Sequence, residues 1–329
     1  MYYSFVFLIN FAFYLFNYYL ALKKHFFLAI LYSILIVYVL GYLSIEFFEN
    51  YGWTLFLLAP LLLGFLPSFI VSNRVTVTKK ESYMMGFIAL FIACIALLVL
   101  GIEGIVCILM SLPLFIISTL LGIVLVHRVN IRNINNPKII LALIVGYIFA
   151  FFTLDYVNYT EDLIPVTSTI VIENSIEKVW GNAIKGSQFS KPDLLLDKLG
   201  IAYPKSSQFK SEGIGAIREY NFTTGSYLQA VSKWDPPYIV EFNTKEAPIH
   251  MTENNPFWEI SPTHLFGYFV SIKGAVKLTE LSSKKTKVEN TTWYQVHMTP
   301  IPYWKLWSNG VVKRFQKAFL ENLKDDSEN

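Results

Sequence analysis

Arg218 is the residue of this sequence whose side chain most needs a partner. It lies in an alternating segment, and strand parity places it on one face with Ala216, Tyr220 and Phe222. The opposite face carries Ile217, Glu219, Asn221 and Thr223. Because the first face is more aromatic, we expect Arg218 to point inward, where an unpaired guanidinium is very costly. We favour a structural ion pair with a neighbouring acid such as Glu241; the alternative is contact with a bound ligand.

The second half of the chain holds the histidines His250, His264 and His297, which with Glu253 could supply metal ligands. Their spacing matches no compact motif, such as two histidines one helical turn apart. The sequence therefore predicts no metal site and no cofactor. His264 and Tyr294 are instead expected to be polar groups of an internal cavity, where they would orient a ligand or move a proton. The alternative is that both only complete the hydrogen bonding of the fold.

Charge and motif content argue against several classes of function. Residues 1–156 hold eight of the 27 Lys and Arg residues and five of the 24 Asp and Glu residues, which leaves 19 of each in the second half. A formally neutral domain gives no electrostatic reason to bind nucleic acid. The sequence also lacks a nucleophile elbow, a phosphate-binding glycine loop and a dinucleotide fingerprint. Both cysteines, Cys94 and Cys107, lie in apolar segments, so no disulfide is expected in the second half.

The elements that must position these residues fall into two parts, and the first part, 1–156, is strongly apolar. The whole chain has 54% hydrophobic residues and a mean hydropathy of +0.44, which is high for a water-soluble protein. Six apolar stretches, each near the roughly 20 residues that a helix needs to cross a bilayer, predict six transmembrane helices. They are 2–22, 26–45, 53–72, 83–101, 104–126 and 138–156. The first has basic residues behind it rather than ahead of it, so we expect an uncleaved helix.

Glu103 lies in the short break between the fourth and fifth apolar stretches. With Gly104, Cys107, Met110 and Pro113 it forms the most distinctive local cluster of this half. An ionisable residue at the end of a membrane helix can mark a site or a pathway. We favour the simpler interpretation that Glu103 lies in a hairpin turn and is hydrated at the membrane surface.

The positive charges of the first half predict its orientation. All eight Lys and Arg residues lie in the first, third and fifth connections between the six stretches. By the positive-inside tendency, these connections face the cytoplasmic side of a plasma or inner membrane. Because the number of crossings is even, both ends of the chain are then expected outside the cytoplasm. A count wrong by one would place the second half in the cytosol.

After a short linker, 157–165, the pattern becomes that of an α+β domain over 166–325, with a polar tail at 326–329. A β-branched strand at 167–172 precedes a helix capped by Asn174 and Ser175, and a second helix is expected at 192–199. Six further strands, predicted from period-two patterns, are expected at 201–211, 215–223, 225–234, 237–246, 264–281 and 286–298. The segment 302–324 has the periodicity of a long amphipathic helix. A curved antiparallel sheet around such a helix commonly leaves a hollow.

Several segments of this domain resemble a known superfamily. They are Gly213–Gly225 (GIGAIREYNFTTG), Val231–Phe242 (VSKWDPPYIVEF), Gly274 with Leu278 and Leu281, Thr291–Tyr294 (TTWY) and Pro302–Trp304 (PYW). From about Thr167 to Lys324 the chain resembles the SRPBCC superfamily, also called START-like or polyketide cyclase/dehydrase-like, and in particular its membrane-anchored bacterial members. The resemblance implies a helix-grip fold with a deep apolar cavity for lipids, sterols or polyketides, and no fixed catalytic set.

One functional hypothesis and two rivals follow. We expect the domain to bind a hydrophobic small molecule or a lipid close to the bilayer, and the sequence identifies no particular protein partner. The candidate cavity residues are Arg218, Tyr220, Phe222, Trp234, His264, Tyr294 and Trp304. The segment 248–264, which contains Phe257 and Trp258, is long enough to act as a lid. The rivals are a cyclase, hydratase or hydrolase acting on an apolar substrate, and a sensor that relays ligand binding to the membrane helices.

Overall fold

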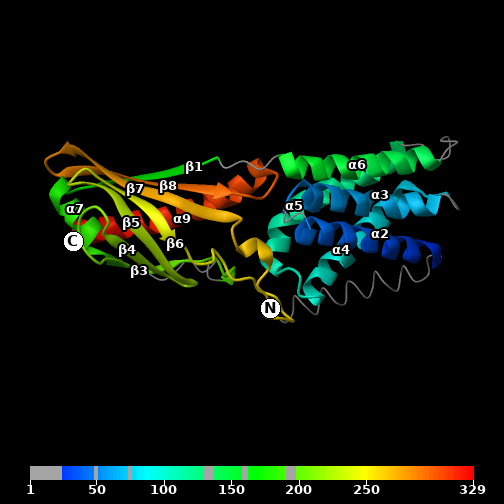
Figure 1. The fold of residues 1–329 in the computed structure, drawn as a ribbon, viewed down its shortest axis with the longest axis horizontal. Coiled ribbons are helices and arrows are strands. Elements are labelled where there is room, and N and C mark those ends of the chain that lie inside the picture. Colours follow the sequence, from blue (N-terminus) through cyan, green and yellow to red (C-terminus); the bar gives the residue numbers. More distant parts are fainter. Residues whose placement is uncertain (1–23, 48–50, 73–75, 129–136, 158–161, 190–197) are drawn as a thin grey trace. The chain divides into compact units, whose positions relative to one another are not determined.

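The computed structural model describes residues 24–47, 51–72, 76–128, 137–157, 162–189 and 198–329 (Figure 1). The chain divides into two compact units. The helical unit comprises Met1–Leu100 and Cys107–Asn158, and the sheet unit comprises Gly101–Val106 and Tyr159–Asn329. The turn at 101–106, which joins two apolar helices, therefore belongs to the sheet unit.

Helices form at each predicted membrane span that lies within the described ranges. They are α2 (Lys24–Tyr42), continued by a π-helical turn η1 (Leu43–Phe47), then η2 (Thr54–Leu58), continued by α3 (Ala59–Ser72), then α4 (Lys79–Val99), α5 (Ile105–Arg128) and α6 (Pro137–Val157). Four helical segments, 25–46, 54–72, 79–99 and 105–128, are long and apolar enough to cross a membrane. The first predicted stretch, 2–22, lies outside the described residues, so the count of six stays a prediction.

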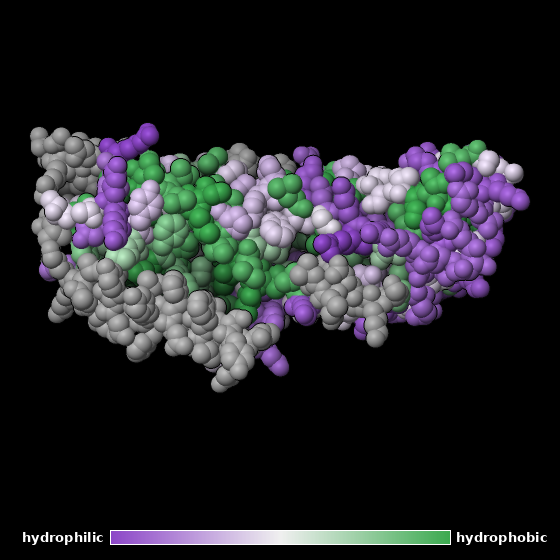
Figure 2. Space-filling view, turned by 180° about the vertical axis from the view of Figure 1, so that it is seen from behind, coloured by the Kyte–Doolittle hydropathy of each residue, from purple (hydrophilic) through white to green (hydrophobic). Residues whose placement is uncertain are grey.

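The surface of the helical unit is rich in exposed apolar side chains. Tyr32, Leu35, Leu109 and Phe149 are each more than half exposed. Figure 2 shows hydrophobic residues over much of this unit, whereas hydrophilic residues dominate the visible surface of the sheet unit. Contiguous apolar surface of this kind is unfavourable in water and is typical of a lipid-facing surface. The apolar helices and their exposed side chains together indicate a membrane protein.

The sheet unit contains one eight-stranded antiparallel sheet. In the order of the sheet, the strands are β1 (Ile164–Ile172), β8 (Lys285–Val296), β7 (Phe269–Ser282), β6 (Ile239–Glu246), β5 (Gly225–Asp235), β4 (Ile217–Phe222), β3 (Pro204–Phe209) and β2 (Ser187–Gln188). The helix α7 (Ile176–Lys185) follows β1, and the long helix α9 (Ile301–Glu328) runs along the sheet (Figure 1). A curved antiparallel sheet with a C-terminal helix is the helix-grip arrangement, as predicted.

Three features of the sheet unit differ from the prediction. The strand β7 begins at Phe269 rather than at 264, because residues 263–265 form a 3-10 turn and Gly267 has a φ of +80°. The helix α9 extends to Glu328, so the prediction of a tail from 326 is wrong; the carbonyl of the buried Ser327 accepts a hydrogen bond from Asn174. The strand β2 was not predicted because two residues carry no period. The helix expected at 192–199 lies almost entirely outside the described residues.

The hydrophobic core of the sheet unit lies between the sheet and the helices α7 and α9. As predicted, α7 begins after Ser175, whose hydroxyl accepts a hydrogen bond from the Lys178 N–H. Val179 on this helix packs in one cluster with Phe242 of β6 and Leu323 of α9, and all three are almost fully buried. Burial of one such side chain contributes about 1.5–3 kcal/mol, so this cluster holds the helices against the sheet.

Candidate ligand-binding cavity

A cavity of about 150 Å³ lies between the sheet and α9. Its walls come from the strands β3 to β8, from α9 and from the segment that follows β6. The aromatic side chains that line it are Phe189, Tyr220, Phe222, Tyr227, Phe242, Phe269, Phe315 and Phe319. Strand alternation explains how β4 contributes: Arg218, Tyr220 and Phe222 are two residues apart and therefore share the inner face, as predicted.

Arg218 lies in the wall of this cavity and is 3% exposed. Its Cζ atom is 4.4 Å from the centre of the Tyr220 ring and 5.0 Å from the centres of the Phe242 and Phe319 rings. Aromatic faces attract a cation, but they do not replace the hydrogen bonds that its N–H groups lose on burial. Within the described part of the chain, Nε and Nη2 of Arg218 have no hydrogen-bond partner.

The favoured interpretation that Arg218 pairs with Glu241 is wrong. Glu241 pairs instead with Lys233, with 4.0 Å between Nζ and Oε1, and both side chains are well exposed. Strand parity is the reason: Phe242 faces the cavity, so the preceding residue faces the other side of β6. Burial lowers the pKa of Arg218, and the nearby hydroxyl of Tyr220 acts in the opposite direction.

A hydrogen-bonded group of polar side chains faces the same cavity from β5 and β7. The Tyr227 hydroxyl lies 2.8 Å from Ser271 Oγ and accepts a hydrogen bond from Gln229 Nε2 at 3.1 Å. The period-two pattern of β5 was not used to place these residues, although it carries the necessary signal. In the hairpin of β4 and β5, Tyr227 lies opposite Tyr220 and Gln229 lies opposite Arg218, so the parity argument for β4 extends to β5.

His250 adds a titratable group to the cavity wall, and it had been considered only as a metal ligand. Its ring centre is 5.7 Å from that of Phe269. Burial, with a further contribution from the charge of His264, lowers the pKa of His250 to about 4, so the ring is neutral at pH 7. Residues 247–250 thus place the start of the predicted lid segment in the cavity wall. Closure of that segment stays a prediction.

Four of the predicted cavity residues lie elsewhere in the sheet unit. Trp234 packs against the hydrophobic core, and Trp304 is buried near the start of α9. Tyr294 is fully buried and donates a hydrogen bond from its hydroxyl to Asn309 Oδ1 at 2.7 Å. Burial raises the pKa of Tyr294 to about 12, so the hydroxyl keeps its proton at neutral pH. The fourth, His264, belongs to a separate polar cluster.

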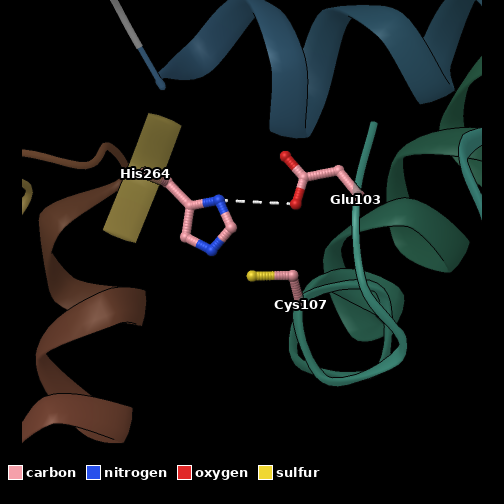
Figure 3. Close-up of side chains that lie close together, drawn as sticks. All are labelled: Glu103, Cys107 and His264. Carbon is pink, nitrogen blue, oxygen red and sulfur yellow. Dashed lines mark ion pairs between the residues drawn. The ribbon is translucent and has the colours of Figure 1, made fainter. Parts of the chain in front are cut away.

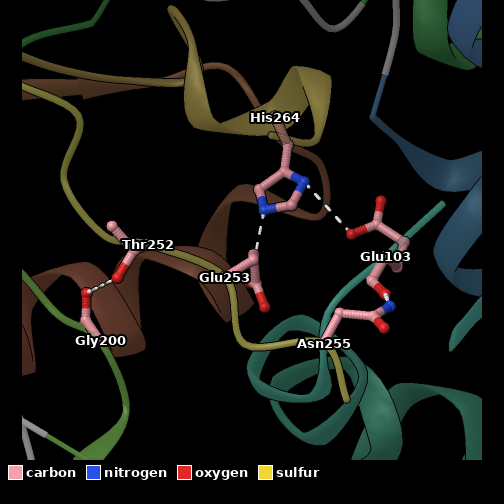
Figure 4. A network of polar contacts seen from close by, with 6 residues as sticks. All are labelled: Glu103, Gly200, Thr252, Glu253, Asn255 and His264. Carbon is pink, nitrogen blue, oxygen red and sulfur yellow. Dashed lines mark hydrogen bonds and ion pairs between the residues drawn. The ribbon is translucent and has the colours of Figure 1, made fainter. Parts of the chain in front are cut away.

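His264 lies between two glutamates of the sheet unit, Glu103 (Figures 3 and 4) and Glu253 (Figure 4). Its Nδ1 is 3.4 Å from Glu103 Oε2, and its Nε2 is 3.7 Å from Glu253 Oε1. The side chains of Glu103, Glu253 and His264 are 12%, 0% and 4% exposed. Burial alone would lower the pKa of His264, but the two adjacent carboxylates outweigh it and raise the pKa to about 9. A protonated His264 therefore neutralises part of the charge of the two carboxylates at pH 7.

The same cluster fixes the turn at 101–106 within the sheet unit. Asn255 Nδ2 donates a hydrogen bond to the backbone carbonyl of Glu103 at 3.1 Å (Figure 4). A Cβ atom at Gly104 would overlap the side chain of Glu253, so this turn approaches the segment after β6 as closely as a glycine allows. Glu103 lies in the turn, as predicted, but the interpretation that its side chain is hydrated is wrong, because the segment 253–264 buries it.

As a metal centre, this cluster is incomplete within the sheet unit. The Glu103 carboxylate and His264 Nδ1 could ligate one ion, and Glu253 would then orient the ring through Nε2, as carboxylates do behind metal-bound histidines. This arrangement supplies two protein ligands, whereas protein zinc sites use about three or four.

No family model matches the sequence, and no curated protein matches it. Solved structures similar to the chain include the Zhui aromatase/cyclase from Streptomyces sp. R1128, with 14% identity and a TM-score of 0.34 over 51% of this chain and 94% of that one. The Aha1 dimer from Colwellia psychrerythraea has 19% identity and a TM-score of 0.30, over 50% of this chain and 96% of that one. Norcoclaurine synthase from Thalictrum flavum, in complex with dopamine and hydroxybenzaldehyde, has 15% identity and a TM-score of 0.29, over 48% of this chain and 84% of that one. TM-scores below 0.5 assign neither a family nor a function to this chain.

Proposed function

We propose that this chain is an integral membrane protein whose sheet unit binds a hydrophobic small molecule, or one apolar group of a lipid, in the cavity beside α9. The observation that carries the proposal is the cavity of about 150 Å³ with its lining of eight aromatic side chains. Cavities of this kind, mostly apolar with a few placed polar groups, are where proteins bind small ligands.

The volume of the cavity limits the size of the group that enters it. An engineered cavity of about 150 Å³ in another protein holds a benzene molecule. Transfer of apolar surface from water into such a site is worth about 25 cal/mol per Å², so even a small aromatic or alkyl group gains several kcal/mol. A whole diacyl lipid is much larger than this space, which favours a small molecule or a single lipid group.

The enzyme hypothesis required Arg218, His264 and Tyr294 to converge. Arg218 faces the cavity, whereas His264 is held between Glu103 and Glu253 and the Tyr294 hydroxyl is bonded to Asn309. Each of the last two side chains thus has partners outside the cavity. Their separation supports binding rather than catalysis by this set.

The positive charges of the helical unit support an extracytoplasmic sheet unit. This assignment depends on six crossings, of which 2–22 is one. A reporter fused after Asn329 tests it: alkaline phosphatase should be active and green fluorescent protein dark. The reverse result would place the sheet unit in the cytosol and would leave the ligand proposal intact.

The proposal is tested on the full chain purified in a mild detergent. We expect solvent extraction and mass spectrometry to recover an apolar compound in stoichiometric amount. Val312→Phe, which fills the cavity from α9, should abolish its recovery, whereas Val311→Phe at the adjacent position, which does not line the cavity, should not. Thermal unfolding is the folding control, and both variants should unfold near the temperature of the wild type. Equal recovery from both variants would place the bound compound elsewhere and contradict the proposal.

A further inference from the structure

The guanidinium of Arg218 lies in the cavity wall and carries two buried hydrogen-bond donors that lack a partner. These donors are Nε and Nη2, and neither has a hydrogen-bond partner among the described residues. In a guanidinium these nitrogens lie on the same edge, so their N–H bonds point in nearly the same direction. This edge matches the two oxygens of a carboxylate, and such paired contacts are among the strongest hydrogen bonds in proteins.

The charge of the cavity is also unbalanced. Among the described residues that line it there is no Asp or Glu, and Arg218 is the one side chain that is charged at pH 7. The adjacent acid, Glu219, points away from the cavity and pairs with Lys210 at 3.1 Å. A buried cation without a counter-charge is unfavourable, so an anion gains from both the charge and the hydrogen bonds.

We propose that the ligand of this cavity is a small carboxylic acid, an apolar body of about the size of a benzene ring whose carboxylate binds Nε and Nη2 of Arg218. This inference rests on the proposed function, because it names the class of ligand for the same site. Tyr220, Phe242 and Phe319 would surround the bound carboxylate–guanidinium pair, and the remaining aromatic side chains would contact the apolar body.

Matched pairs of probes test this inference on the full chain in detergent. The acids are benzoate and hexanoate, and their neutral partners are benzamide and hexanamide, which have nearly the same shape. Binding is measured by ligand-observed NMR or calorimetry after endogenous compounds have been removed. We expect each acid to bind at least about tenfold more tightly than its amide, which corresponds to a single charge-assisted pair.

Three variants separate charge from hydrogen-bond geometry. Arg218→Met should remove the preference for the acid, so that each acid and its amide bind with nearly equal affinity. Arg218→Lys keeps the charge but lacks the paired donors, so it should retain only part of the preference. Arg314→Met removes an exposed arginine of α9 that does not line the cavity and should keep the full preference.

The outcomes distinguish this inference from the proposed function. If an acid and its amide bind equally, or if the compound extracted from the native protein is neutral, the ligand is not a carboxylic acid. The proposed binding function would still stand. If inorganic phosphate competes with benzoate as strongly as hexanoate does, the site recognises anions in general and the ligand class is wrong. If no probe binds and no compound is extracted, the proposed function itself is contradicted.

Discussion

Arg218 and His264 are both 3% exposed in the sheet unit, yet their surroundings differ. Both are cationic at pH 7, because arginine keeps its proton in proteins and the pKa of His264 is raised to about 9. His264 lies between two carboxylates that belong to the chain itself, at 3.4 and 3.7 Å. Arg218 lies among aromatic rings, and two of its N–H groups have no hydrogen-bond partner within the described residues. One buried cation is therefore paired by the fold, and the other is not.

The difference indicates two roles for buried charge in one unit. A paired group fixes the elements that carry its partners, here the turn at 101–106 and the segment 253–264. An unpaired group lowers the stability of the folded chain until something binds to it, which is a common cost of a binding site. The comparison predicts that removing His264 destabilises the sheet unit and that removing Arg218 does not.

The largest expected effect is that of His264→Leu. This variant leaves Glu103 and Glu253 buried without their cation, and we expect the free energy of unfolding at pH 7 to fall by about 3–5 kcal/mol. Guanidinium titration of the full chain in detergent, followed by tryptophan fluorescence, measures this loss. His25→Leu, which removes an exposed histidine of α2, is the control and should change little.

A triple variant sharpens the same test. In Glu103→Gln, Glu253→Gln and His264→Leu combined, no charge is left uncompensated, so most of the lost stability should return. If the triple variant is as unstable as His264→Leu alone, the loss comes from packing around the ring. The pairing of His264 would then not be what distinguishes it from Arg218.

The second expected effect is a dependence of stability on pH with two limbs. The pKa of His264 is about 9 in the folded chain and 6.5 in the unfolded chain. The contribution of His264 to the free energy of unfolding is therefore fully present below pH 6.5 and is lost as the pH rises through 9. A shift of this size corresponds to about 3 kcal/mol. The pKa of His250 is lowered to about 4, so its contribution is present above pH 6.5 and is lost as the pH falls through 4.

Unfolding titrations between pH 4 and pH 10 separate these two limbs. His264→Gln should flatten the alkaline limb, and His250→Asn should flatten the acid limb. Comparison of the stability slopes of each variant with those of the wild type therefore assigns each limb to one histidine. An alkaline limb that survives in His264→Gln would show that another group titrates there.

These examples also show how far the sequence could predict the site. Strand alternation depends on adjacent residues alone, so it correctly placed Arg218, Tyr220 and Phe222 on one face of β4. Alternation does not show how far along the sheet a residue lies. For this reason Trp234 and Tyr294, which have suitable side chains for a cavity, were assigned to it although they lie in other parts of the interior.

The cluster at His264 could not have been predicted from local patterns. Glu103 and His264 are far apart in the sequence, and neither lies in a motif that requires the other. The predicted strand at 264–281 also assigned His264 to the wrong element, because the apolar residues after it continue a period-two pattern across Gly267. Glu103 looked like a hydrated turn residue because the segment that buries it follows some 150 residues later.

A smaller effect is expected from Gly104→Ala, which tests how closely the paired cluster is packed. The added Cβ would overlap the Glu253 side chain, and overpacking of this kind costs about 1–3 kcal/mol. Gly181→Ala in α7 is the matched control, because nothing lies within 4 Å of its added Cβ and alanine favours the helix. Equal unfolding midpoints for the two variants would show that the turn at 101–106 moves away from Glu253 at little cost.

The smallest expected change has the opposite sign and tests the other half of the comparison. In the absence of ligand, Arg218→Met replaces an unpaired buried guanidinium with an apolar side chain of similar length, and we expect the free energy of unfolding to rise by about 1 kcal/mol. The gain is small because the variant also loses the attraction between the guanidinium and the rings of Tyr220, Phe242 and Phe319. Guanidinium titration of ligand-free protein measures it, with Arg314→Met as the control. A loss of more than about 1 kcal/mol would mean that the ring contacts stabilise the folded chain by more than burial of the charge destabilises it, and Arg218 would then be structural like His264.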